Sequence, residues 1–141
     1  MDFLTTFKIA GQGLSVQRAK MDVITSNLAN AATTKTPKGG PYRRKSVVLK
    51  AQPVESQFTG SLKDALQGVQ VKAVVEDGSP AKRIHDPTHP DADAKGYVAM
   101  PNVNVMLEMA DMITASRTYE ACVTAFDASK SMALKTLDIG K

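Results

Sequence analysis

The chain has 141 residues, about the size of one domain, and its formal net charge is +4. It has no Trp, three Tyr, four Phe and a single cysteine, so an internal disulfide framework is excluded. Its apolar content comes mainly from Ala, Val, Met and Leu, which favours long helices over a thick mixed core.

Residues 4–31 are predicted to form one long helix. Its apolar positions alternate by three and four residues, close to a heptad repeat. Gly11 and Gly13 weaken this helix locally, each by roughly 1 kcal/mol relative to Ala. The resulting stripe consists of Phe7, Ala10, Leu14, Gln17, Met21, Ile24, Leu28 and Ala31.

The N-terminus does not resemble a secretory signal peptide. Asp2 stands where a basic region is expected, and the apolar stretch after it is interrupted by polar residues and glycines. No window approaches the roughly 18 apolar residues of a membrane span. We therefore expect no direct membrane insertion, and a protein that is cytosolic or exported without a cleaved signal.

A basic window follows the predicted helix. There is no acidic residue between Val23 and Val54, and such a patch could meet nucleic acid, anionic lipid or an acidic protein surface. A solvated loop face is the more ordinary interpretation of a charge run. The basic residues of this window are Lys35, Lys38, Arg43, Arg44, Lys45 and Lys50.

The middle of the chain is predicted to be rich in turns and short strands. Residues 32–42 form a turn-rich connector, and residues 47–49 and 69–75 are predicted strands. Residues 61–67 fit a short helical turn or a loop. The turn signal at residues 77–80 precedes a possible returning strand at residues 82–85.

The segment HDPTHPDAD, residues 85–93, contains both histidines of the chain and raises the question of a metal site. His85 and His89 would share a helix face, but Pro87 and Pro90 prevent a regular helix. The segment also lacks the glutamate of a zinc-protease motif and the Gly and Glu of a calcium loop. We predict a rigid loop whose Asp and Thr side chains bond to nearby backbone, with no metal and no cofactor.

Residues 105–137 are predicted to form a second long helix. Pro101 and Asn102 precede it, where helix starts are marked, and Gly140 follows it. Its apolar positions again alternate by three and four. They are Val105, Met109, Met112, Ser116, Tyr119, Val123, Phe126, Lys130, Ala133 and Leu137.

No catalytic set emerges from the sequence, so the chain is not expected to be an enzyme. Cys122 lies within the second helix, away from the helix N-terminus or cationic neighbour that a reactive thiolate needs. The glycines at 11 and 13 lack the third glycine of a dinucleotide-binding fingerprint.

Two stretches carry a resemblance to a known family. Residues 26–31, SNLANA, with the Thr-rich turn and Tyr42-Arg43-Arg44 after them, resemble the signature of bacterial flagellar rod and hook proteins. Residues 86–105, DPTHPDADAKGYVAMPNVNV, and matches on to residue 140 resemble the proximal rod branch of that family. The motif positions are Ser26, Asn27, Leu28, Ala29, Asn30, Tyr97, Pro101, Asn102, Tyr119, Glu120 and Phe126.

The resemblance implies a structural subunit of the flagellar basal body. Its partners would be copies of itself, other rod subunits (proximal rod proteins, the rod-base adaptor and distal rod proteins) and the flagellar type III export apparatus. It would lie in the rod that spans the periplasm, reach it without a cleaved signal, and bind no nucleic acid. The loop at residues 85–93 would shape the entry to the C-terminal helix or a contact between subunits.

The expected fold is mainly α with a small β-rich insert. Residues 1–32 and 101–141 supply the long terminal helices, which form a coiled-coil-like pair in the assembly, and residues 33–100 form the connector and the insert. Two helices cannot enclose a large core, so leftover apolar surface implies further partners. The predicted assembly stripe is Phe7, Leu14, Met21, Ile24, Leu28, Val105, Met109, Met112, Tyr119, Val123, Phe126 and Leu137.

Two other classes of function remain open at the level of sequence. A nucleic-acid-binding protein would use the basic window with Tyr42, and its affinity would fall steeply with salt. An enzyme would use the His/Asp loop and would bind metal in stoichiometric amount. The structural interpretation predicts neither property.

Overall fold

The computed structural model describes residues 3–53 and 67–139. The described elements are α1 (Phe3–Ala29), β1 (Lys45–Pro53), β2 (Gln67–Glu76), β3 (Lys82–His85), β4 (Tyr97–Met100) and α2 (Val105–Ile139). The turn or loop predicted for residues 61–67 lies outside the described residues except for Gln67, which begins β2.

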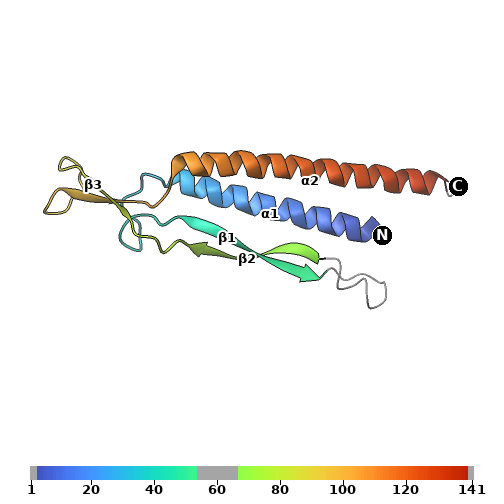
Figure 1. Cartoon of the computed structure of the whole chain (residues 1–141), viewed down its shortest axis with the longest axis horizontal. Coiled ribbons are helices and arrows are strands. Elements are labelled where there is room, and N and C mark those ends of the chain that lie inside the picture. The colour runs from blue at the N-terminus through green and yellow to red at the C-terminus, as the bar shows by residue number, and fades with distance from the viewer. Residues whose placement is uncertain (1–2, 54–66, 140–141) are drawn as a thin grey trace.

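The molecule is elongated and consists of a helix pair with two β-ribbons (Figure 1). α1 and α2 run antiparallel, with both chain termini at one end of the molecule. β1 and β2 run alongside α1, whereas β3 and β4 extend past the other end of the helices. The prediction of two long terminal helices with a small β-rich insert is confirmed, and both ribbons of the insert are antiparallel.

Local sequence signals fix where α2 begins. Pro101 is buried just before it, and the Asn104 side-chain oxygen accepts a hydrogen bond from the Leu107 backbone N–H at 3.4 Å. This satisfies one of the free N–H groups of the first turn. α2 has 35 residues and α1 has 27, so α2 is the longer by about 12 Å.

β1 and β2 form a two-stranded antiparallel ribbon that is longer than the predicted strands. Lys45 pairs with Glu76 at one end and Pro53 with Gln67 at the other. The register shifts between Val48 and Leu49, which is the mark of a β-bulge. The ribbon contacts α1 through both of its strands.

The strand at residues 82–85 forms, but the prediction that it returns onto the preceding strand is wrong. β3 pairs with β4, with Lys82 opposite Met100 and His85 opposite Tyr97, and β2 pairs only with β1 among the described strands. The turn at residues 77–80 therefore passes the chain from one ribbon to the other. The sequence prediction also missed β4.

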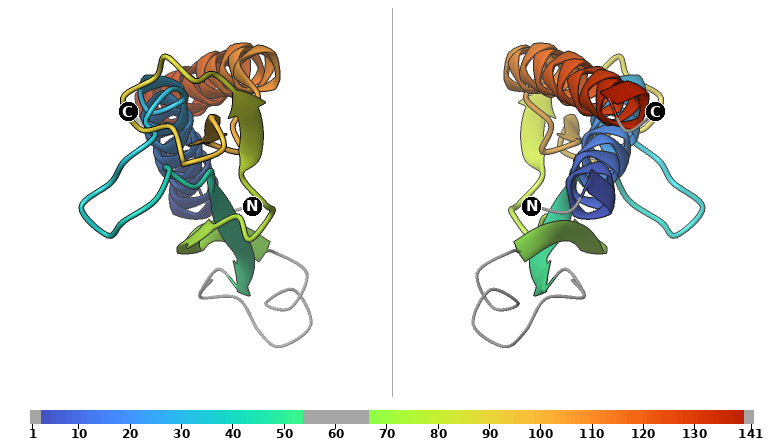
Figure 2. Two further views of the ribbon diagram at one scale, coloured as in Figure 1. Left: turned by 90° about the vertical axis from the view of Figure 1, so that its left-hand side faces the viewer. Right: turned by 90° about the vertical axis from the view of Figure 1, so that its right-hand side faces the viewer.

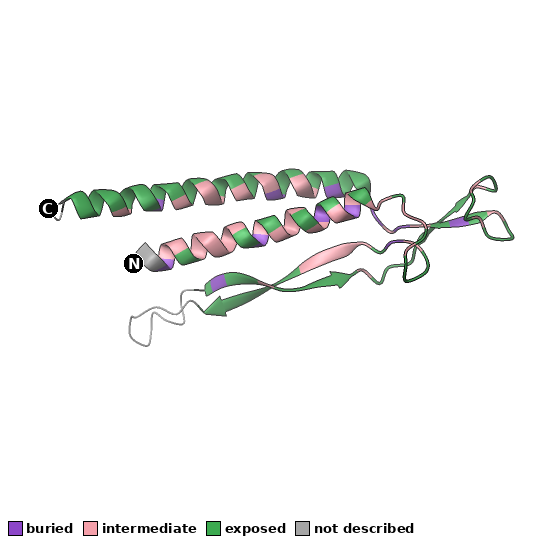
Figure 3. Ribbon diagram, turned by 180° about the vertical axis from the view of Figure 1, so that it is seen from behind, coloured by how far each residue is buried: buried purple, intermediate pink, exposed green. Residues whose placement is uncertain are grey.

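Little apolar surface is fully enclosed. The buried apolar side chains among the described residues include Val16, Ile24, Tyr42, Val98, Pro101, Val103 and Ala115. Most of the outer surface of α2 is exposed (Figure 3). The view along the long axis shows the connector between α1 and β1 projecting from the side of the helix pair (Figure 2). No described helix is long and apolar enough to cross a membrane.

Candidate functional site

The end of α1, the start of β1 and the start of α2 meet at a buried polar cluster centred on Asn27. The Asn27 amide pairs with the backbone of β1 as a neighbouring strand would. Its Oδ1 accepts the Lys45 N–H at 2.9 Å, and its Nδ2 donates to the Lys45 carbonyl at 2.9 Å. Because Asn27 is 1% exposed, these bonds form away from water and fix β1 on the helix pair.

Glu108 supplies the charge of this cluster from the first turn of α2. Its Oε2 accepts a hydrogen bond from Asn27 Nδ2 at 3.0 Å, and its Oε1 accepts one from Arg44 Nε. Arg44 Nη2 also lies 3.7 Å from Asp111 Oδ2. Glu108 is 0% exposed, so an ionised carboxylate at this position depends on these partners. The first turn of a helix also favours a negative charge.

Neighbouring residues complete the junction. Tyr42 OH donates to Asn27 Oδ1 at 3.0 Å, and Ser26 Oγ lies 3.2 Å from the same hydroxyl. Asn30 Nδ2 donates to the Ser26 carbonyl at 2.9 Å just after α1 ends. The predicted SNLAN motif therefore works as an anchor: Ser26, Asn27 and Asn30 make its polar bonds, Leu28 is half-buried and Ala29 is exposed.

The later motif residues are divided between the same junction, α2 and β4, whose first residue is Tyr97. The Asn102 side-chain oxygen accepts the Arg44 backbone N–H at 2.8 Å, which places it in the cluster beside the buried Pro101. Tyr119 is half-buried on α2, whereas Glu120 is exposed. Phe126 packs edge-on against Phe7 with ring centroids 4.9 Å apart.

Sequence reasoning missed Glu108 as a functional residue. The signal that could have identified it is a lone acid at the start of α2, within the apolar run Val105–Ala110. Its partner Arg44 was assigned to the basic window and to the family signature, without a partner of its own. Their pairing, across 64 residues, is a tertiary contact that no local spacing reports.

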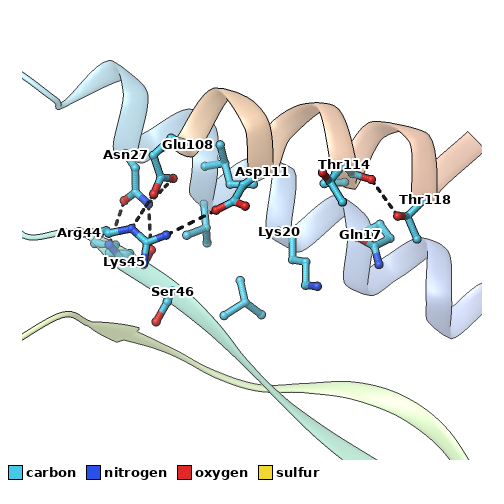
Figure 4. Close-up of a pocket in the computed structure, with 14 residues that line it drawn as sticks. Gln17, Lys20, Asn27, Arg44, Lys45, Ser46, Glu108, Asp111, Thr114 and Thr118 are labelled. Carbon is cyan, nitrogen blue, oxygen red and sulfur yellow. Dashed lines mark hydrogen bonds and ion pairs between the residues drawn. The ribbon is translucent and has the colours of Figure 1, made fainter. Parts of the chain in front are cut away.

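A groove of about 310 Å³ extends from this cluster between α1, β1 and α2. Figure 4 shows Asn27, Arg44 and Glu108 at one end of it and Gln17 and Thr118 at the other. None of its lining residues is a histidine or a cysteine. The polar and apolar side chains that line the groove can form hydrogen bonds and packing contacts.

The predicted assembly stripe divides into two groups. Ile24 is buried, and the half-buried members are Phe7, Leu14, Met21, Leu28, Met112, Tyr119, Val123 and Phe126. Val105, Met109 and Leu137 are exposed, so α1 does not cover them. The helix pair thus covers most of the stripe, and both ends of α2 remain uncovered.

Apolar side chains outside the predicted assembly stripe are also exposed near these two ends of α2. Met106, Leu107 and Ile113 join Val105 and Met109 in the first turns of α2, and Met132 and Leu134 join Leu137 near its end. Exposed apolar patches of this kind mark interaction surfaces.

The loop at residues 85–93 uses its polar groups on itself. The His85 ring packs edge-on against Tyr97, with centroids 5.0 Å apart, and His89 Nδ1 accepts the Asp91 N–H at 3.1 Å. Asp86 Oδ1 accepts from the Thr88 hydroxyl at 2.6 Å and from the Thr88 N–H at 3.1 Å. Within residues 3–53 and 67–139, no three or more His, Cys, Asp or Glu side chains gather as they would around a metal ion.

Backbone hydrogen bonds also perturb the acids of this loop. Asp93 Oδ1 accepts the Tyr97 N–H at 3.0 Å and the Lys95 N–H at 2.8 Å, and these bonds lower the pKa of the Asp93 carboxyl. The Asp91 carboxylate accepts from the Thr34 hydroxyl at 2.7 Å. That contact ties the loop to the connector.

Comparison with known proteins places both termini in flagellar families. A model described as "Flagella basal body rod protein" matches residues 7–35. A second, described as "Flagellar basal body rod FlgEFG protein C-terminal", matches residues 94–139.

Full-length relatives agree. The flagellar basal-body rod protein FlgC of Salmonella typhimurium is 43% identical over 141 residues, covering 100% of both chains. That of Borreliella burgdorferi is 43% identical over 149 residues, covering 99% of this chain and 98% of the relative. That of Bacillus subtilis is 42% identical over 146 residues, covering 96% and 97%.

Proposed function

Because the chain belongs to the FlgC family of flagellar basal-body rod proteins, we propose that it stacks through α1 and α2 into the helical tube of the proximal rod. Family membership gives it a structural, non-enzymatic role in the rod. In this proposal residues 1–32 and 101–141 form the rod core, and residues 33–100 form the connector and the outer ribbons. Its neighbours are copies of itself, other proximal rod proteins, the rod-base adaptor and distal rod proteins.

The observation that carries this proposal is the apolar surface that the helix pair leaves uncovered. Met106, Ile113 and Leu137 are 76%, 59% and 70% exposed. Burying such side chains against neighbouring helices is favourable by about 1.5–3 kcal/mol each. Coiled-coil-like packing of neighbouring helix pairs would make a stiff tube, as torque transmission requires.

The polar junction supports the same proposal. Asn27 and Glu108 join α1, α2 and β1 through bonds that are specific in direction, so the ribbon is held at one position on the helix pair. A subunit that transmits torque needs such fixed internal joints.

Export forms a further part of the proposal. The chain leaves through the flagellar type III apparatus without a cleaved signal. A single cysteine allows passage of an unfolded chain, because no internal disulfide can form. The helix ends, which are short of apolar partners in one chain, become fully ordered only on assembly.

The nucleic-acid alternative receives less support from the basic window. Arg44 pairs with the buried Glu108, and Lys38 Nζ lies 3.7 Å from Glu76 Oε1. Lys45 Nζ lies 5.7 Å from the centre of the Tyr42 ring. These charges therefore have roles within the chain, and we expect no salt-dependent binding in a filter assay with generic DNA.

Recovery of the chain from purified basal bodies tests the rod role. Cells that lack the chain should not swim, and an epitope-tagged full-length copy should restore swimming and copurify with the rod. Removing an unrelated periplasmic protein is the control. Swimming cells whose basal bodies do not contain the chain would overturn the proposal.

A further inference from the structure

The ribbon formed by β3 and β4 is a separate body from the helix pair. β3 and β4 contact each other and no other described helix or strand, and they lie beyond the end of the helices in Figure 1. The loop between them is held by backbone bonds: the Asp86 N–H donates to the Gly96 carbonyl at 2.9 Å, and the Asp93 N–H donates to the Tyr97 carbonyl at 2.9 Å. Residues 82–100 therefore form an arm that holds its own shape.

Two segments, residues 77–81 and 101–104, join the arm to the rest of the chain and form its neck. Between them, Asn102 Nδ2 donates to the Ser79 carbonyl at 3.4 Å, which is long for a hydrogen bond and therefore weak. A Cβ added at Gly78 would meet nothing within 4 Å, so the first segment has open space beside it. A short neck of this kind allows an arm to turn as a rigid body.

The connector between α1 and β1 lies against one side of the arm. An open cleft of about 410 Å³ lies between them, and its lining includes Pro41 of the connector and Val98 of the arm. Val98 is 2% exposed, so the arm is seated against the connector at this point. Thr34 Oγ1 donates to Asp91 Oδ2 at 2.7 Å. Within residues 3–53 and 67–139, this is the one side-chain hydrogen bond between the connector and the arm.

We propose that the connector is a strap that sets the angle of the arm, and that the bond between Thr34 and Asp91 fastens it. With the bond formed, the arm is held both at its neck and at Asp91. With the bond broken, the arm turns about the neck, the cleft gives it room, and its internal hydrogen bonds keep its shape. In the proposed rod, where neighbours include other proteins as well as copies of the chain, an adjustable arm can fit different surfaces.

The strap is built to open without unfolding the chain. The bond between Thr34 and Asp91 lies at the surface, where water competes for both groups, so its net contribution to stability is small. Turning the arm would expose Val98, and the free energy of exposing an apolar side chain favours the fastened form. The fastened form therefore dominates in the isolated chain, and a neighbour that binds the turned arm more tightly shifts the balance.

Distance measurements by double electron–electron resonance on the purified full-length chain test the strap. Cys122→Ser provides a background that has no other thiol. Spin labels are attached at Lys95→Cys on the arm and at Asp22→Cys on α1, because both positions are exposed. The width of the distance distribution then reports how far the arm turns. We expect a narrow distribution in the labelled background and one at least twice as wide with Thr34→Val.

Thr36→Val is the matched control, because the Thr36 hydroxyl also belongs to the connector but bonds only the Gly39 and Gly40 carbonyls. Its distribution should stay narrow, as should that of Thr34→Ser, which keeps the hydroxyl. Asp91→Ala should widen the distribution as Thr34→Val does. The two changes together should widen it no further, because they remove the same bond.

The Tyr97 amide resonance shows whether the arm is folded in each variant, and if one variant loses it, the other carries the test. A narrow distribution with both Thr34→Val and Asp91→Ala would overturn the strap. A background distribution already as wide as theirs, or further widening in the double variant, would overturn it as well. None of these results touches the rod role, because the strap is a property of one chain. Absence of the wild-type chain from basal bodies would contradict the rod role and leave the strap intact.

Discussion

Glu108 is an acid in a position that a core residue would normally occupy. Its carboxylate is held by Asn27 and Arg44, and Arg44 remains 27% exposed. Replacing Glu108 with Ala leaves Asn27 Nδ2 with one acceptor fewer, removes the anionic partner of Arg44 and opens a cavity. We expect the free energy of unfolding to fall by about 3 kcal/mol, as for other broken buried pairs.

Urea unfolding followed by circular dichroism measures this loss. Glu120→Ala is the control, because Glu120 is an exposed acid on the same helix and its loss should change the free energy by less than about 0.5 kcal/mol. Equal stability of the two variants would contradict the anchoring role of Glu108.

Asp93 gives the loop at residues 85–93 a dependence on pH. The backbone N–H groups of Tyr97 and Lys95 stabilise its charged form and lower its pKa in the folded chain. The folded-state pKa is below the unfolded-state value, so this contribution is complete above about pH 4 and is lost as the pH falls through the folded-state pKa.

The Tyr97 amide proton resonance reports this titration by NMR. We expect it to shift with a midpoint below the ordinary Asp range, and Asp93→Asn should abolish the shift. Asp91→Asn is the control, because the Asp91 carboxylate accepts from the Thr34 hydroxyl and makes no hydrogen bond to Tyr97. A midpoint at the ordinary Asp value would contradict the role of these hydrogen bonds.

Sequence reasoning predicted the polar junction only in part, for a physical reason. The SNLAN motif and Asn102 were identified by resemblance, and their polar side chains do form hydrogen bonds at the junction. Glu108 could not be found in this way. Its burial depends on a contact with Arg44, which lies 64 residues earlier in the sequence. A spacing rule detects neighbours on one element and not contacts between elements.

At the scale of elements, periodicity was a good guide to the helices and a poor one to strand pairing. Both helices form within two residues of their predicted bounds. A long run of apolar residues spaced by three and four matches the period of an α-helix and not that of a strand. β3 was given the wrong partner, because four residues carry too little pattern to choose between β2 and β4. The partner is set by the loop at residues 85–93, whose internal hydrogen bonds turn the chain back.

The contact between the helices gives a prediction at this scale. A Cβ added at Gly13 would lie 3.2 Å from the Cys122 Sγ, whereas one added at Gly11 would meet nothing within 4 Å. Replacing Gly by Ala inside a helix gains about 1 kcal/mol from propensity alone. We therefore expect Gly11→Ala to stabilise the chain by about that amount and Gly13→Ala to stabilise it less.

A double-mutant cycle separates propensity from crowding. In a Cys122→Ala background, Gly13→Ala should recover the full gain of about 1 kcal/mol, because the crowding atom is gone. Thermal unfolding of the four chains provides the comparison. If Gly13→Ala gains as much with Cys122 present, the helices do not approach closely at this point.

At the scale of the whole molecule, the apolar stripe of a helix can pack against a helix of the same chain or against a helix of another chain. The apolar stripes predicted contacts between helices but could not say whether these lie within a chain or between chains. The structure assigns most of the stripe to the α1–α2 contact and leaves both ends of α2 exposed. The helix pair therefore forms a unit, and its remaining surface is available for neighbours.

Phe126 tests whether this helix pair is the unit that the rod incorporates. Phe126→Asp would remove the ring contact with Phe7 and place an unpaired charge in the contact between α1 and α2, which costs several kcal/mol. We expect loss of swimming in soft agar and loss of the chain from basal bodies. The Tyr97 amide resonance should persist, because β3, β4 and their loop lie at the other end of the molecule. Phe126→Leu keeps an apolar side chain and should retain swimming, whereas normal swimming with Phe126→Asp would show that the rod does not require the pairing of α1 with α2.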